Sequence, residues 1–289
     1  MNGPLLASAA LFDQQVLGYA ARVFCMAVSL GLFAFVQESK PARAATGESA
    51  RVPIFHDHFD SGSLDSSKWM IENRPANGTI QGHKGFFTPE NVDFSVGMLR
   101  LKLVQSTTAD GIVSYGASIQ SKEKFSYGQY QFVMRMASTS ATPSGRGSEL
   151  SGSVSSAFIF VNNAETELDI EYLGDRAGLL HLSNWRNTEP SQHPSGGFEG
   201  FNDIRQYEKI PFRGAADAFH MYVIEWKPSV VKWYIDGKQV ASHDTHVPEA
   251  PAYIKLNLWG TNRKEWGGVA TPGTARYMYI RNVSFSPME

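Results

Sequence analysis

Apolar and polar residues alternate along much of the chain from residue 45 onward, and no stretch keeps helical spacing over four turns. Alternation with a period of two is typical of β-strands, whose successive side chains point to opposite faces. The clearest expected strands are Met98–Val104, Tyr127–Met136, Val154–Val161, Glu165–Tyr172, Leu179–Trp185, Phe219–Lys227, Ala252–Trp259 and Tyr277–Phe285. Two further strands, Val230–Ile235 and Lys238–Ser242, flank Asp236-Gly237, a dipeptide that favours a tight hairpin turn. Short strands rich in Tyr, Phe and Trp predict an all-β sandwich.

The part of the chain after residue 44 contains no segment with the composition of an interdomain linker, so we expect one domain over residues 45–289. Two polar stretches, Ala137–Ser153 and Asn187–Asp203, are expected as long surface loops. Loops of more than about 12 residues are uncommon in compact domains and are often functional.

The first 44 residues have the features of a secretory signal. The apolar run Val23–Val36 follows Arg22, and Ala42-Arg43-Ala44 gives a small-x-small cleavage motif before Ala45. The alternative is a transmembrane anchor, but the run is shorter than the roughly 20 residues that a membrane span needs. We therefore expect residues 1–44 to be a signal peptide. After its cleavage the protein should have no membrane attachment and should be secreted or periplasmic.

Composition narrows the possible functions. The full chain of 289 residues has 26 basic and 28 acidic residues, and its aromatic content of 12% is too high for a disordered chain. Without a basic stripe, we expect no nucleic-acid partner. Cys25 is the only cysteine, so an intrachain disulfide and a cysteine metal site are both excluded.

The most informative segment is the acidic strand Glu165–Tyr172. Alternation places Leu168, Ile170 and Tyr172 on one face together with Thr166, and four carboxylates on the other: Glu165, Glu167, Asp169 and Glu171. Like charges crowded on one face destabilise a sheet, so this pattern needs a compensating function.

Paired carboxylates at this spacing can perform glycoside hydrolysis. Glu167 and Glu171 lie roughly 13 Å apart at their Cα atoms, and side chains that lean together bring their carboxyls to about 5–6 Å. That distance is typical of retaining glycosidases, in which one carboxylate attacks the anomeric carbon and the other protonates the leaving oxygen. The charge of Asp169 between them would raise the proton affinity of both neighbours. A solvent-facing acidic edge and a calcium site are the alternatives, although a flat strand surrounds an ion poorly.

At this motif the sequence resembles glycoside hydrolase family 16. The resemblance rests on Glu167-Leu168-Asp169-Ile170-Glu171 and on segments in the expected order along residues 55–285, among them Thr88–Val92, Tyr127–Tyr130, Lys232–Gly237 and Asn257–Trp259. It implies a β-jelly-roll sandwich of two curved antiparallel sheets of the concanavalin A-like kind. It also implies a retaining mechanism on β-linked polysaccharide, with Glu167 as nucleophile, Glu171 as acid/base and Asp169 as the assisting carboxylate.

The resemblance to lichenases within the family suggests sugar-binding residues. Asn77 corresponds to a cleft asparagine, with an ordinary turn residue as the alternative. Phe158 and Phe160 correspond to stacking aromatics, although their strand is apolar on both faces and core packing explains them nearly as well. Trp185, Asn257 and Trp259 are expected to line the cleft, and His181 is either another cleft residue or a structural histidine.

Several positions depart from the lichenase pattern: Glu165, Gln131, Val133, Ser183 and Met278. Met278 stands where the family has a calcium-binding Asp, so we expect no metal site and no cofactor. The resulting prediction is an exported, monomeric, endo-acting hydrolase of β-1,3-1,4-glucan or bacterial exopolysaccharide. A transglycosylase with the same site and a non-catalytic, lectin-like carbohydrate-binding module are the alternatives.

Overall fold

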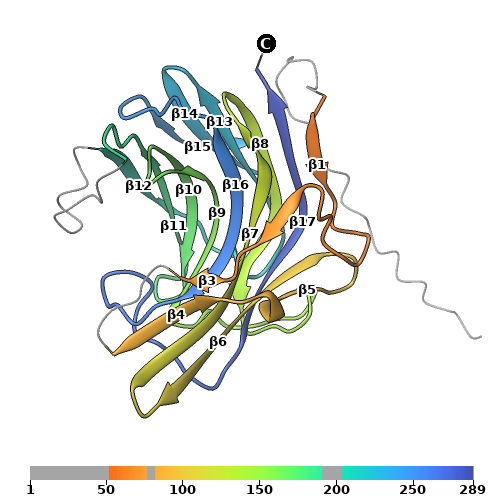
Figure 1. The fold of residues 1–289 in the computed structure, drawn as a ribbon, viewed down its shortest axis with the longest axis vertical. Coiled ribbons are helices and arrows are strands. Elements are labelled where there is room, and N and C mark those ends of the chain that lie inside the picture. Colours follow the sequence, from red (N-terminus) through yellow and green to blue (C-terminus); the bar gives the residue numbers. More distant parts are fainter. Residues whose placement is uncertain (1–51, 77–81, 191–203, 289) are drawn as a thin grey trace, which may run out of the picture. The chain divides into compact units, whose positions relative to one another are not determined.

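A computed structural model describes residues 52–288 except 77–81 and 191–203, and Figure 1 shows the fold. The predicted signal peptide and Asn77 lie outside the described residues. Strands make up almost all regular structure in the described part, and the only other regular element there is the short 3-10 turn η1 (Pro89–Asn91). No helix in that part is long and apolar enough to cross a membrane.

One antiparallel sheet, here called sheet A, forms the first layer. Its central strands are β8 (Gly128–Ser138), β13 (His220–Lys227) and β17 (Arg276–Pro287). Beyond β13 lie β14 (Val230–Ile235) and β15 (Lys238–His243), and beyond β17 lie β1 (Phe55–Asp57), β5 (Val92–Phe94) and the first half of β6 (Leu99–Thr108). Asp236 and Gly237 between β14 and β15 both have positive φ, as the predicted hairpin turn requires.

A second antiparallel sheet, sheet B, forms the layer that carries the acidic strand. Its order is β2 (Trp69–Ile71), β7 (Gly111–Phe125), β16 (Ala252–Gly260), β9 (Ser153–Val161), β10 (Thr166–Leu173), β11 (Leu179–Trp185) and β12 (Arg205–Pro211). In Figure 1, β7, β16, β9, β10 and β11 run side by side as a curved layer. The acidic strand therefore lies inside the sheet, with two strands on its β12 side.

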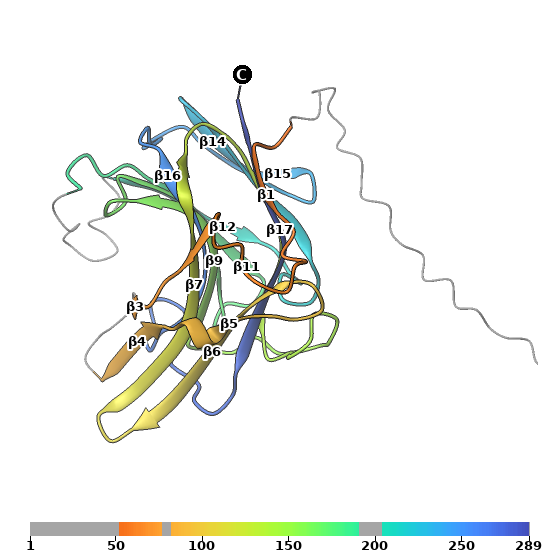
Figure 2. The ribbon, with the colours of Figure 1, turned by 45° about the vertical axis from the view of Figure 1, so that its right-hand side comes forward.

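The long hairpin of β6 and β7 extends beyond both layers. Its outer part pairs with β4 (His83–Phe87), which runs parallel to β7 and also pairs with β3 (Arg74–Pro75). Figure 2 shows this small sheet projecting beside the main layers.

The core between the layers is built from the inward residues of both sheets. Trp69, Trp226 and Trp233 are fully buried there, as are Leu168 and Ile170 of the acidic strand. The predicted all-β sandwich of curved antiparallel sheets is confirmed. Strands β7 and β12 were not among those expected from alternation, although both belong to the sheet that carries the acids.

Candidate active site

Residues of the acidic strand β10 lie alternately in the core and on the opposite face, as predicted. Glu165, which was also expected on the acid face, lies in the turn before the strand instead. Leu168, Ile170 and Tyr172 belong to the hydrophobic core. Glu167 and Glu171 are only partly buried, and Asp169 lies between them on the opposite face. A strand with one apolar face needs that face in the core, so the packing of sheet A on sheet B places the carboxyls together on the outer face of sheet B.

Asp169 is the most firmly anchored of the three acids. Its Oδ2 accepts hydrogen bonds from Ser183 Oγ at 2.5 Å and from Trp185 Nε1 at 2.9 Å, both on the neighbouring strand β11. Its main-chain oxygen accepts from Nε1 of the core residue Trp233 at 3.0 Å. A carboxyl held at both its side chain and its backbone is fixed in position, which suits a group that must orient its neighbours.

The three carboxyls shift each other's ionisation. Burial, followed by the charges of Asp169 and Glu171, raises the pKa of Glu167 well above its ordinary value. Burial raises the pKa of Asp169 to about 6, although hydrogen bonds from Ser183, Trp185 and Glu167 oppose the shift. Burial and the charge of Asp169 raise the pKa of Glu171 to about 8. The row therefore retains protons at neutral pH, and one of its carboxyls can act as a general acid.

Phe158 and Phe160 lie beside the acids. In the pairing of β9 with β10, Phe158 is opposite Asp169 and Phe160 is opposite Glu167, and both rings are partly exposed. Their ring centroids are 6.2 Å apart in an edge-to-face arrangement. The structure thus places both rings on the acid face rather than in the core, and their sugar-stacking role stays a prediction.

Trp185 and Asn257 lie on opposite sides of the acidic strand, Trp185 on the neighbouring β11 and Asn257 on β16, which lies beyond β9. Trp185 is opposite Glu167 on β11 and donates to Asp169, so it contacts the acidic row directly. Asn257 on β16 is opposite Ser156, whose hydroxyl donates to Glu171 at 3.3 Å. The buried Oδ1 of Asn257 has no hydrogen-bond partner among the described residues. Such an oxygen could accept a hydrogen bond from a sugar hydroxyl.

Trp259 occupies a more enclosed position than a sugar platform requires. It packs in a small cluster with Phe87, Val154 and Leu173, and Trp266 covers part of that cluster. Its side chain is only 9% exposed. Trp259 alternates in phase with Asn257 on β16, as predicted. The contact of Trp259 with substrate stays a prediction.

Two positions that depart from the lichenase pattern lie away from the acids. The resemblance matches Gln131 and Val133 to a Glu and an Arg that bind sugar hydroxyls, but both residues lie on β8 of sheet A. The strand next to β16 in sheet B is β7 instead, and its Ser118 is opposite Asn257. Strand order across a sheet cannot be read from local alternation, so only the structure identifies the strand that borders β16.

A buried ion pair lies near the acids and was not predicted. Lys255 of β16 donates to Glu72 at 2.8 Å, and Arg74 and Ser118 also bind that carboxylate. The ammonium lies 5.9 Å from the ring centroid of Phe158, and its charge partly opposes the rise in the pKa of Glu167. The signal was present in the sequence, because Lys255 alternates in phase with Asn257 and Trp259.

A second unpredicted group lies on β12 beyond β11. Arg205 is opposite Trp185, Tyr207 is opposite Ser183, and Lys209 is opposite His181. His181 is buried, its Nδ1 forms a short hydrogen bond with the Tyr207 hydroxyl, and burial lowers its pKa to about 4. His181 is thus a buried residue that fixes Tyr207, and whether it also serves the cleft stays a prediction.

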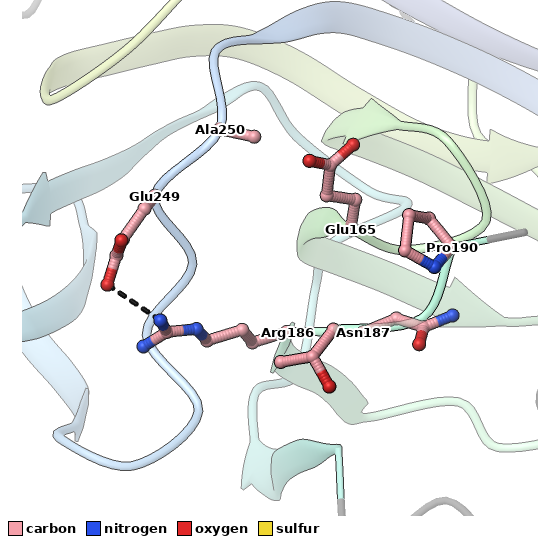
Figure 3. Close-up of a pocket in the computed structure, with 7 residues that line it drawn as sticks. Glu165, Arg186, Asn187, Pro190, Glu249 and Ala250 are labelled. Atoms are coloured by element: carbon pink, nitrogen blue, oxygen red, sulfur yellow. Dashed lines mark ion pairs between the residues drawn. The ribbon is translucent and has the colours of Figure 1, made fainter.

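A pocket of about 370 Å³ lies at the start of the acidic strand, where Glu165 is among its lining residues. Figure 3 shows Arg186 and Glu249 joined across this pocket, with their charged atoms 2.8 Å apart. Asn187, Pro190 and Ala250 also line it. The described residues that line this pocket include no aromatic ring, so they give a sugar no stacking surface.

The described residues do not form a metal site. Within the described ranges, no group of three or more His, Cys, Asp or Glu side chains is placed to bind a metal ion. Met278 is fully buried and offers a thioether, whereas calcium requires oxygen ligands. Position 278 therefore does not fit calcium, and the absence of a cofactor stays a prediction.

Comparisons with known proteins give a consistent result. The sequence profile described as "Glycosyl hydrolases family 16" matches residues 81–280. A β-glucanase of Acetivibrio thermocellus is 30% identical over 248 residues, which are 83% of this chain and 64% of that protein. A β-glucanase of Bacillus subtilis (strain 168) is 28% identical over 275 residues, 91% of this chain and 98% of that protein.

Solved structures agree on the fold. A prokaryotic β-1,3-1,4-glucanase (lichenase) derived from a mouse hindgut metagenome superposes with a TM-score of 0.64 at 24% identity, covering 81% of this chain and 99% of its own. The chain spans less than two thirds of the length of the Acetivibrio relative, so that protein is a longer molecule than the part matched here.

Proposed function

Because the chain belongs to family 16 of the glycosyl hydrolases, we propose that it is an exported, endo-acting enzyme that cleaves β-linked glucan with retention of anomeric configuration. Family membership confirms the predicted enzyme class, a glycoside hydrolase acting on O-glycosyl bonds. The relatives are named β-glucanases, which makes a β-glucan the first substrate to test.

The observation that carries the proposal is the row of three carboxyls on one face of β10, with raised pKa values and fixed partners. In the proposed reaction Glu167 attacks the anomeric carbon while Glu171 gives its proton to the leaving oxygen. A glycosyl ester on Glu167 results. Glu171, now a carboxylate, then takes a proton from water, which attacks the anomeric carbon and releases Glu167.

Asp169 has the role of a proton partner for the nucleophile. A hydrogen bond joins the carboxyls of Glu167 and Asp169; it adds to the rise in the pKa of Glu167 and opposes the rise in the pKa of Asp169. The pair thus holds one proton between two acids, and these directions favour its position on Glu167 in the free enzyme. We propose that this proton passes to Asp169 in the reactive state, which leaves Glu167 as the carboxylate that attacks.

The test compares Glu167→Gln with Glu165→Gln, an identical chemical change two residues earlier, in the turn that precedes β10. Reducing ends released from a mixed-linkage β-glucan should fall by more than about 10⁴-fold for Glu167→Gln and stay within about twofold for Glu165→Gln. Circular dichroism should show both variants folded. If the folded Glu167→Gln variant still hydrolysed the glucan, Glu167 could not be the nucleophile.

Retention itself needs a separate measurement. NMR of the first product should show the β-anomer before mutarotation, and Glu167→Ala with azide should form an α-glycosyl azide, since azide then attacks from the emptied face. An α-anomer as the first product would contradict the double displacement. Export and a monomeric state are proposed on the sequence prediction, and a mature N-terminus at Ala45 would support export.

A further inference from the structure

Lys255 is a buried cation on the acid face of sheet B. It lies on β16 opposite Phe158, and Phe158 lies opposite Asp169 of the acidic strand, so the three side chains share one face. Among the cations on the described strands of sheet B, Lys255 alone is buried, whereas Lys209 is exposed and Arg205 is partly exposed. A buried charge is screened much less by water and salt than a surface charge is.

The ammonium of Lys255 lies between a carboxylate and two aromatic rings. It donates to Glu72 at 2.8 Å, and it lies 5.9 Å from the ring centroid of Phe158 and 5.6 Å from that of Phe160. Glu72 directly follows β2 at the edge of the sheet, and Phe160 is opposite Glu167 of β10. Across the sheet the order is therefore Glu72, then the ammonium, then the rings, then the acids.

The carboxylate that holds the ammonium is also balanced by a second cation. Arg74 donates to both oxygens of Glu72, from Nε to Oε1 at 3.0 Å and from Nη2 to Oε2 at 3.1 Å. One carboxylate and two cations leave this ion cluster (Glu72, Arg74 and Lys255) with a net charge of +1. Because Arg74 offsets much of the Glu72 charge, the positive field of Lys255 reaches the neighbouring acids.

We propose that Lys255 is a positioning residue for Glu167: its buried charge stabilises the carboxylate that attacks the anomeric carbon, and Glu72 and Arg74 hold the ammonium in place. The inference rests on the proposed function, in which Glu167 is the nucleophile. With only 4% of its side chain exposed, Lys255 does not reach the substrate and acts through Glu167. Burial and the neighbouring acids raise the pKa of Glu167, and the charge of Lys255 opposes that rise, as this role requires.

Other titratable or charged groups also lie on or beside the acid face. Strand β9 contributes none. Strands β10 to β12 contribute Asp169, Glu171, His181, Arg205, Tyr207 and Lys209. Tyr253 and Lys124 face each other on β16 and β7, and the turns at the two ends of β10 add Glu165 and Arg176. These groups are the same in the wild type and in every variant below, so a change in pKa reports the change in the ion cluster.

The test is the pH dependence of kcat/KM on a neutral mixed-linkage β-glucan. Its lower limb reports the protonation that removes the Glu167 carboxylate from the free enzyme. Strands in a sheet lie about 4.8 Å apart, so β16 and β10 are about 10 Å apart. A unit charge at about 10 Å changes a pKa by about one pH unit at an effective dielectric constant of about 20. Lys255→Met should therefore raise the lower pKa by about one pH unit, and its unbranched side chain still packs against both rings.

Three further variants separate charge from structure. Lys255→Arg keeps the charge and should keep the lower pKa within about 0.3 pH unit of the wild type. Ser118→Ala is the matched control, since it removes a hydrogen bond to Glu72 but no charge, and it should also leave the lower pKa unchanged. If circular dichroism shows Lys255→Met unfolded, Lys255→Met with Glu72→Gln replaces the ion pair by neutral groups. Its lower pKa should rise by only about 0.3 pH unit, because losing the Glu72 charge cancels part of the effect.

The outcomes separate this inference from the proposed function. Failure of the wild type to cleave the glucan would overturn the proposed function, and the role of Lys255 with it. Cleavage by the wild type, with a lower pKa that does not rise in the folded Lys255 variants lacking the charge, would overturn the role of Lys255 alone. A kcat/KM that falls equally at every pH would show a structural role only and would also overturn it. So would a rise in the lower pKa that Ser118→Ala reproduces, because that variant changes no charge.

Discussion

Replacing Glu171 by Gln should stabilise the fold while removing the general acid. The folded protein holds the Glu171 proton up to about pH 8, because burial and the charge of Asp169 raise its pKa from 4.5. The unfolded chain releases that proton near pH 4.5. Between these values the unfolded state binds fewer protons, so the free energy of unfolding falls as pH rises.

The magnitude follows from this difference in pKa. The contribution of Glu171 falls by about 1.4 kcal/mol per pH unit between about pH 4.5 and 8, which amounts to about 3 kcal/mol at pH 7. Gln cannot ionise, and it keeps an oxygen that can accept the hydrogen bond from Ser156. Glu171→Gln should therefore match the wild type near pH 4.5 and be more stable by up to about 3 kcal/mol at pH 7.

Urea unfolding followed by tryptophan fluorescence at pH 4.5, 6, 7 and 8 would measure this difference. The matched control is Glu165→Gln, in the turn that precedes β10, which should change the free energy of unfolding by less than about 0.5 kcal/mol at every pH. A Glu171→Gln protein that is less stable at pH 7, or whose stability difference does not grow with pH, would refute the reasoning.

Three further predictions concern the same face. In wild type, kcat/KM should decline above about pH 8 as Glu171 loses its proton, and a decline centred below pH 6 would contradict its role as the acid. Trp185→Phe keeps a ring but removes the hydrogen bond to Asp169, so kcat should fall about tenfold with KM within about twofold; an unchanged kcat would count against this positioning. Lys255→Met should lower the free energy of unfolding by about 3–5 kcal/mol in urea titrations, because it leaves the buried Glu72 without its ammonium partner, and adding Glu72→Gln should restore most of the loss.

The sequence determined the class of fold and the face of the acidic strand. Alternation is a local property, since each residue of a strand points opposite to its neighbours whatever the partner strands are. Leu168 and Ile170 were therefore assigned to the core, and Glu167 and Glu171 to the other face, without any knowledge of tertiary structure. The Asp236-Gly237 turn was predictable for the same reason, because its two residues alone favour the required backbone.

Only the tertiary structure decided what surrounds the acids. The Glu72–Lys255 pair joins residues 183 positions apart, and Trp233 of sheet A donates to the backbone of Asp169. Arg205 faces the acids only because β12 pairs with β11 in this register. Such neighbours depend on strand order, register and the packing of one sheet on the other, and these depend on burial summed over the whole chain. Phe158 and Phe160 show what alternation alone cannot decide. Their strand is apolar on both faces, so only the assembled sandwich places them beside the carboxyls.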